Sequence, residues 1–182
     1  DADPVAKVTI VARGQAGGDT RTLPEEDRNL ITRNELEARL AMAMGGRVAE
    51  QLVFDEVTTG AGSDLEQATS TARMMVTRYG MSEKLGPRTF GKREEMVFLG
   101  REISEQRDYS DSVAQTIDEE VHRLIETAQN TARDVLEEHR SRLDRISKYL
   151  LEHETIEEDQ VKEVFDSLPP AADMSPAPMP AD

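Results

Sequence analysis

The chain contains no cysteine and no tryptophan, and aromatic residues make up only 4% of its 182 residues. The absence of cysteine excludes disulfides and Cys-ligated zinc sites, so nothing here indicates a disulfide-stapled secreted protein. With so few aromatic side chains, the core must consist of Leu, Val, Ile, Ala and Met. That composition favours packed helices over a β-sandwich.

Long hydrophobic runs and positive charges are also scarce. No apolar stretch approaches the ~20 residues that span a bilayer, and no signal peptide is recognisable, so we expect this chain to be soluble. The 22 Lys and Arg against 37 Asp and Glu give a formal charge of −15. So acidic a chain repels phosphate backbones, and we expect no nucleic-acid partner. Because it opens Asp-Ala-Asp-Pro, without Met, we expect a piece of a longer protein.

The predicted fold is mainly α-helical with a small β element. Residues 5–12 are rich in β-branched side chains and predict a strand, in which Val8, Ile10 and Ala12 share one face. Residues 88–91 and 96–99 predict two further short strands of a hairpin. The Pro-rich residues 167–182 cannot fold compactly and are predicted to be a disordered tail.

Helices account for most of the remaining sequence. Thr32 and Glu35 form a capping box that opens a helix reaching about Phe54, with an apolar residue at every fourth position. Inside it, Gly45 and Gly46 each cost about 1 kcal/mol against Ala, which indicates either a closely packed partner or a kink.

The second half predicts three more helices. An apolar stripe from Ser110 onward indicates two long helices that part near residues 137–140. Thr155 and Glu158 form another capping box, which predicts a short helix reaching about Phe165.

Residues 57–65, Val-Thr-Thr-Gly-Ala-Gly-Ser-Asp-Leu, predict a loop that delivers one carboxylate to a helix start. Ser63 with Glu66 forms a capping box, which places Asp64 at the first helical position. An anionic oxygen held there suits a metal cation. Acidic residues in a first turn more often serve only the helix dipole, and the local pattern leaves both interpretations open.

The histidines give no independent metal site. His122, His139 and His153 show no i, i+4 spacing, and none lies near Asp64 in sequence. We therefore expect them to be surface or half-buried helix residues. No P-loop and no G-x-S-x-G motif is present.

Several short motifs follow one another in a fixed order: VTIVARG at 8–14, LPEED at 23–27, GGRVAE at 45–50, TTGA at 58–61, SDL at 63–65, MVT at 75–77, GMSEKLGP at 80–87 and VFLG at 97–100. Together these motifs resemble the FtsH family of membrane-bound, ATP-dependent zinc proteases, and the resemblance covers about residues 5–166.

The resemblance implies a specific role for Asp64. In the family, two histidines and a catalytic Glu come from an H-E-x-x-H helix, and an Asp that matches Asp64 is the third zinc ligand. Three protein ligands leave one tetrahedral position for a water molecule. This chain has no H-E-x-x-H. In the family that helix precedes the matching region, as does the AAA+ ATPase module with its ATP and Mg. The resemblance therefore implies that the chain alone is inactive.

The same resemblance implies the organisation of the parent protein. Residues 1–166 correspond to the C-terminal part of its peptidase domain, with an active-site subregion at 5–100 and a helical subregion at 110–166. The parent is expected to be a homo-hexamer anchored in the bacterial cytoplasmic membrane, with this domain in the cytoplasm, degrading unfolded membrane and soluble proteins. The alternative is a non-catalytic acidic helical module for interaction or oligomerisation, without an H-E-x-x-H upstream.

Two further features have implied roles. Glu50 is either a second carboxylate that orients a ligand histidine or, as we favour, a structural partner of Arg47. The strand with Val8 and Ile10 lies beside the cleft in the family, so an extended substrate can add to its edge by main-chain hydrogen bonds.

Overall fold

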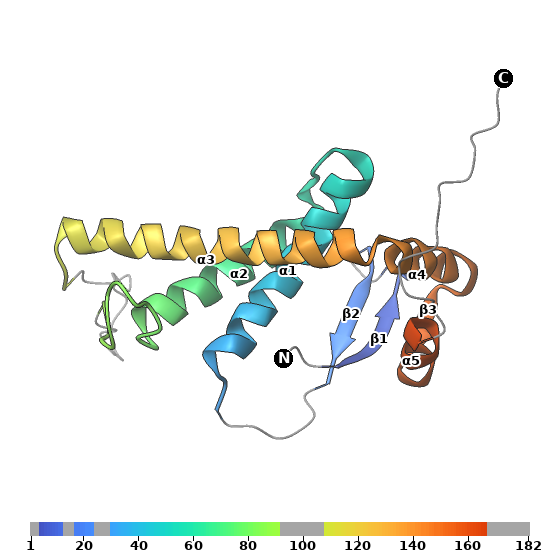
Figure 1. The fold of residues 1–182 in the computed structure, drawn as a ribbon, viewed down its shortest axis with the longest axis horizontal. Helices are drawn as coiled ribbons and strands as arrows, with labels where there is room; N and C mark the ends of the chain where they lie inside the picture. Colours follow the sequence, from blue (N-terminus) through green and yellow to red (C-terminus); the bar gives the residue numbers. More distant parts are fainter. Residues whose placement is uncertain (1–3, 13–16, 24–29, 92–107, 167–182) are drawn as a thin grey trace, which may run out of the picture. The chain divides into compact units, whose positions relative to one another are not determined.

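A computed structural model describes residues 4–12, 17–23, 30–91 and 108–166 of the chain (Figure 1). The mainly α-helical prediction with a small β element is confirmed. The elements are, in order, β1 (Val5–Thr9), β2 (Asp19–Thr22), α1 (Arg33–Phe54), the 3-10 helix η1 (Thr59–Ala61), α2 (Gly62–Thr77), α3 (Asp111–Glu138), α4 (Arg140–His153), β3 (Thr155–Glu157) and α5 (Glu158–Asp166). The predicted tail and the predicted strand at 96–99 lie outside the described residues.

These residues form two compact units. The first holds residues 30–91 and 108–133, and the second holds residues 4–12, 17–23 and 134–166, so that α3 contributes to both. The predicted domain, residues 1–166, was divided into an active-site subregion at 5–100 and a helical subregion at 110–166. That division by function stays a prediction. Packing groups the residues differently, because the N-terminal strands belong with the C-terminal helices.

The first unit is built on helix α1. Thr32 accepts a hydrogen bond from the backbone N–H of Glu35, and the Glu35 carboxylate accepts one from the Thr32 N–H, so the predicted capping box is confirmed. The predicted stripe is buried at four of its positions, which are Leu36, Leu40, Met44 and Val48. Helix α1 runs unbroken through Gly45 and Gly46, and a Cβ at either would meet none of the described atoms within 4 Å. Of the two explanations left open for these glycines, a closely packed partner is not found among the described residues.

Helix α2 packs against α1 through small side chains. Ala68 and Ala72 are 1% and 0% exposed, and Met75 and Val76 are also buried. The helix is followed by Gly80, at φ +61°, a left-handed conformation that glycine adopts without strain. A side chain at Gly80 would also clash, because its Cβ would lie 2.9 Å from the Cα of Pro87.

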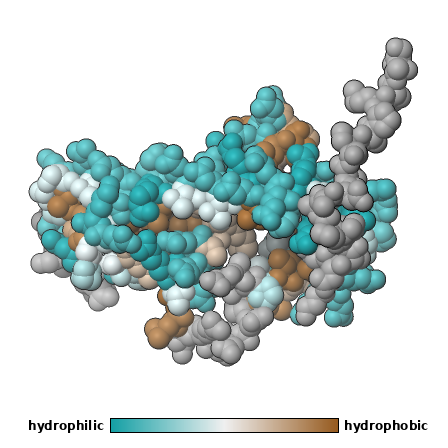
Figure 2. Space-filling model, viewed as in Figure 1, coloured by the Kyte–Doolittle hydropathy of each residue, from teal (hydrophilic) through white to brown (hydrophobic). Residues whose placement is uncertain are grey.

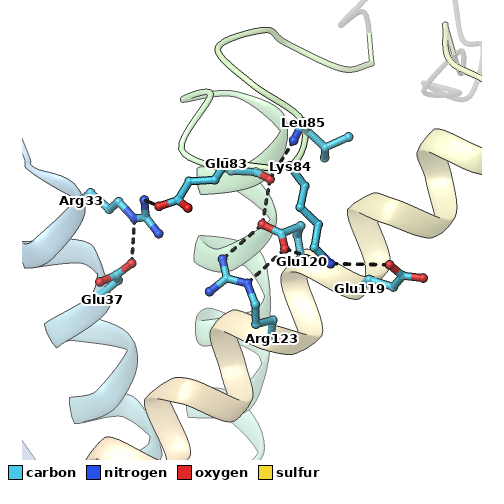
Figure 3. A network of polar contacts seen from close by, with 9 residues as sticks. Arg33, Glu37, Glu83, Lys84, Leu85, Glu119, Glu120 and Arg123 are labelled. Carbon is cyan, nitrogen blue, oxygen red and sulfur yellow. Dashed lines mark hydrogen bonds and ion pairs between the residues drawn. The ribbon is translucent and has the colours of Figure 1, made fainter.

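A network of charged side chains fastens the loop after α2 to α3 (Figure 3). Glu120 is 1% exposed, and its carboxylate accepts hydrogen bonds from Ser82 Oγ at 2.8 Å and from Arg123 Nε at 3.0 Å. Lys84 Nζ lies 3.7 Å from the same carboxylate. In the same loop, Glu83 pairs with Arg33 at the start of α1. The buried charge is thus matched by donors from two elements, as a buried carboxylate requires.

The aromatic rings of Phe90 and Tyr109 form a second contact, between the loop after α2 and the residues just before α3. Their rings lie edge to face with centroids 6.0 Å apart, and the N–H of Gly91 donates to Asp108 Oδ1 at 2.8 Å. Residues 88–91 form no strand, so that part of the predicted hairpin was wrong. The N–H of Phe90 donates to the carbonyl of Thr77 at the end of α2, not to a partner strand.

The second unit contains a three-stranded antiparallel sheet in the order β2-β1-β3. Helices α4 and α5 flank β3 in sequence, and Ile156 of β3 is buried. The prediction that Thr155 caps a helix was wrong, because residues 155–157 pair with β1 and α5 begins only at Glu158. The parting of α3 from α4 at His139 agrees with the predicted break.

Most of the face in Figure 2 is hydrophilic, with a compact apolar patch at the C-terminal end of α1. There Phe54 is 71% exposed, and Val53 and Val57 are exposed beside it. Within the described residues, no helix combines the length and hydrophobicity that a bilayer crossing requires.

Replacing Glu120 with Ala should lower the free energy of unfolding by about 2 kcal/mol, because Ser82, Arg123 and Lys84 lose their shared acceptor. Urea unfolding followed by circular dichroism measures this change. The matched control is Glu119→Ala, one residue earlier on the exposed side of α3, which should change stability by less than about 0.5 kcal/mol. Equal losses for both variants would contradict the importance of the buried position.

The same carboxylate predicts a pH dependence. Hydrogen bonds from Arg123 hold the pKa of Glu120 below its ordinary value, although burial opposes them, and Ser82 adds to the lowering. Because the folded pKa lies below the unfolded value of about 4.3, the stabilisation is full above that pH and is lost as the pH falls through the folded pKa. The stability gap between wild type and Glu120→Gln should therefore be constant from pH 7 to 5 and shrink below about pH 4. A gap that widened on acidification would contradict this.

Candidate functional site

The connection from α1 to α2 brings the predicted ligand to its position. Helix α1 ends at Phe54, and its C-cap residue Asp55 adopts a left-handed conformation at φ 55°. The turn of 3-10 helix η1 then runs directly into α2, whose first residue is Gly62. The prediction that Ser63 caps this helix was wrong: the cap position is Ala61, and its side chain makes no capping hydrogen bond. Thr58, the residue before η1, caps that 3-10 helix through its side chain.

Asp64 is accordingly the third residue of α2 and not the first. It remains in the first turn, where the partial positive charge of the helix N-terminus stabilises an anion. Its side chain is exposed, and no hydrogen bond or ion pair joins it to another residue in the described part of the chain. Asp64 also precedes the buried Ala68 by one turn, so it lies at the edge of the apolar stripe of α2.

Glu50 contacts a residue that the sequence analysis did not single out. Its Oε2 accepts a hydrogen bond from the backbone N–H of Thr58 at 3.1 Å, and its Oε1 accepts one from Thr58 Oγ1 at 2.9 Å. These two bonds lower the pKa of Glu50, and the charge of Arg47 contributes less. Glu50 and Arg47 form no ion pair in the described structure. The structural partner of Glu50 is therefore Thr58, and not the Arg47 that we had predicted. A partner eight residues away across a loop leaves no periodic signal in the sequence.

A zinc site needs several His, Asp or Glu side chains grouped around one ion. No group of three or more His, Asp or Glu side chains able to hold a metal occurs among the described residues. His122 and His153 are exposed and His139 is half-buried. His153 stacks on Tyr149, with ring centroids 4.2 Å apart. The described residues therefore contain no complete zinc site, and the role of Asp64 as a ligand stays a prediction.

The sheet corrects the prediction for Val8 and Ile10. Strand β1 is the central strand, and Val8 pairs with Thr20 on one side and with Ile156 on the other. The N–H of Ile10 donates to the carbonyl of Glu154 at 3.0 Å. Neither residue offers a free edge, because β3 occupies the side that the sequence left open. Among the described strands, the outer edges belong to β2 and β3.

Comparison with known proteins identifies the family of the chain. A model of peptidase family M41 matches residues 1–164. The chain belongs to peptidase family M41. It is 54% identical over 98% of its length to the ATP-dependent zinc metalloprotease FtsH 1 of Thermomicrobium roseum, covering 27% of that protein.

Other M41 relatives are similarly close. The FtsH 1 protein of Sphaerobacter thermophilus is 56% identical over 91% of this chain, with 25% of its own length covered. The FtsH protein of Chloroflexus aggregans is 55% identical over 93%, with 26% covered. The chain thus spans about a quarter of the length of these curated relatives, and its match to FtsH-family proteases confirms the resemblance seen in the motifs.

The incomplete donor set predicts weak metal binding by this chain. Titration of the chain with zinc, followed by calorimetry, should show no site with sub-micromolar affinity, because one carboxylate replaces only part of the hydration shell of the ion. Asp64→Asn should leave the titration curve unchanged. A sub-micromolar site with a stoichiometry of one would contradict the prediction.

Proposed function

We propose that this chain forms the C-terminal part of the peptidase domain of an ATP-dependent zinc metalloendopeptidase, with Asp64 as one of three zinc ligands. The observation that carries the proposal is an exposed carboxylate in the first turn of α2, without a partner among the residues that the structure describes, in a chain of peptidase family M41. The relatives' shared name, ATP-dependent zinc metalloprotease, supports the reaction class.

The chemistry of Asp64 supports its proposed role. A carboxylate is a common zinc ligand, and a helix start holds it in a fixed direction at little entropic cost. Zinc, when bound by Asp64 and two histidines of the parent, would supply a Lewis acid that polarises a peptide carbonyl. The contribution of this chain is to hold the Asp64 oxygen in a defined direction before the ion binds.

The exposed apolar surface of α1 also supports a larger parent. Met42 and Val53 are exposed, and the space over Gly45 and Gly46 is open in the described structure. Phe54 and Val57 extend this surface to the loop before α2, where Figure 2 shows the apolar patch. An apolar helix face with open glycines suits burial under another helix, and the histidine-bearing helix of the parent is the occupant that the proposed zinc site requires.

The remaining properties of the parent belong to the same proposal. It is anchored in the cytoplasmic membrane through segments outside this chain, assembles as a homo-hexamer and takes ATP and Mg in a separate module. Its substrates are unfolded membrane and soluble proteins. The family's named members are ATP-dependent proteases, which supports the coupling of ATP hydrolysis to proteolysis.

The test is Asp64→Asn in the full-length parent. Loss of a direct ligand should weaken zinc binding by more than ~100-fold, beyond the effect of losing a supporting residue, and abolish casein cleavage. Chelator competition measures the zinc affinity, and circular dichroism verifies folding. The matched control is Glu66→Gln, which removes an exposed carboxylate two residues later in α2 and should retain zinc and activity. Wild-type zinc affinity in Asp64→Asn would contradict the proposal and favour a non-catalytic helical interaction module.

A further inference from the structure

The carboxylate of Glu50 joins the loop between α1 and α2 to the body of α1. Glu50 lies one turn before the end of α1, and both of its oxygens accept hydrogen bonds from Thr58, one from the backbone and one from the hydroxyl. The two bonds fix both the position and the rotamer of Thr58. Because hydrogen bonds to a charged acceptor are roughly twice as strong as neutral ones, this attachment is firm for an exposed loop.

The attachment continues from Thr58 to the start of α2. Thr58 Oγ1, while donating to Glu50, accepts the N–H of Gly60 at 3.1 Å, which begins the turn of η1. The next residue, Ala61, is buried, and α2 follows at Gly62 without an intervening coil. Three hydrogen bonds thus connect the body of α1 to the turn from which Asp64 projects.

Gly60 fits this connection closely. A Cβ built at Gly60 would lie 3.2 Å from Thr58 Oγ1 and 3.6 Å from Glu50 Oε1. A side chain there would press on the hydroxyl that links the two bonds. Gly62, two residues later, has no described atom within 4 Å of its Cβ position. Of these two glycines, only Gly60 has little room for a side chain, and it is the one whose side chain would contact Thr58 and Glu50.

We infer that Glu50 is a positioning residue for the proposed zinc site, and that it acts through Thr58 and Gly60 to fix the direction in which Asp64 projects. The inference rests on the proposed function, since it takes Asp64 to be a ligand. Metal sites need their ligands held to within about 0.5 Å by supporting side chains. A loop ordered in advance leaves less conformational entropy to be lost when the ion binds.

A direct contact between Glu50 and a ligand histidine is the competing role. A carboxylate offers about four acceptor positions, and Thr58 uses two of them. The two roles differ in what Thr58 contributes. If Glu50 acts through the loop, removal of the Thr58 hydroxyl weakens zinc binding as removal of the Glu50 charge does. If Glu50 holds a histidine, the hydroxyl has no effect.

The experiment uses the full-length parent and measures zinc affinity by chelator competition. Thr58→Val keeps the shape and the backbone N–H but removes the hydroxyl, and should weaken zinc binding roughly tenfold, as Glu50→Gln should. The double variant should be no more than about twofold weaker than either single variant, since the two residues act as a unit. Thr58→Ser should retain wild-type affinity.

The matched control and a second readout separate positioning from general damage. Thr69→Val removes an exposed α2 hydroxyl that donates to the Leu65 carbonyl, and should leave zinc affinity unchanged. In the zinc-free enzyme, hydrogen exchange measured on peptides covering residues 55–62 should be faster in Thr58→Val and Glu50→Gln than in wild type or Thr69→Val.

The outcomes distinguish the inference from the proposed function. Wild-type zinc affinity in Thr58→Val, beside lost affinity in Asp64→Asn, would overturn the inference alone. The same holds if Glu50→Gln weakens binding while Thr58→Val does not, or if the two changes are additive. Wild-type affinity in Asp64→Asn would overturn the proposed function and this inference together.

Discussion

The close approach of α2 to α1 is the packing constraint on which the candidate site depends. Ala68 and Ala72 are almost completely buried, and alanine allows two helix backbones to come nearer than Leu or Met would. The small, non-aromatic side chains that predicted a helical fold therefore also allow α2 to pack closely. Because the helix is rigid along its length, burial of its middle determines where its first turn lies, and Asp64 is carried there without needing contacts of its own.

Both ends of α2 are then fixed by charged groups on neighbouring elements. At its N-terminal end the carboxylate of Glu50 holds Thr58, and at its C-terminal end the carboxylate of Glu120 holds Ser82. The two carboxylates differ in exposure: Glu120 is buried and needs Arg123 and Lys84 to remain charged, whereas Glu50 is half-buried and relies on Thr58. In a chain of net charge −15, both carboxylates are constrained by the donors they meet. The hydrogen bonds that these two carboxylates accept offset their charges locally.

Sequence reasoning succeeded where the signal was periodic or local. The Thr32–Glu35 capping box and the fourfold spacing from Leu36 predicted α1 to within one residue, because both signals lie within one helix. Sequence reasoning failed where contacts between segments far apart in the chain determine the local structure. Residues 155–158 satisfy a capping box and a strand equally well, and pairing with β1 made them a strand. The same pairing removed the free edge expected at Val8. In the candidate site, the resemblance predicted Asp64 as a ligand, which stays a prediction, and only the structure could show that Glu50 contacts Thr58 and not Arg47.

The helix-dipole interpretation of Asp64 and the ligand interpretation are compatible, and the geometry explains how one supports the other. An acidic residue in a first turn contributes roughly 0.3–1 kcal/mol to its helix whether or not a metal is present. The same first-turn position would present the carboxylate oxygen to a cation in the proposed metal site. A residue serving the dipole alone has no need of a turn held by three hydrogen bonds. In the proposed metal site, such a turn would fix the direction of the carboxylate, which matters to a bound ion and not to a helix dipole.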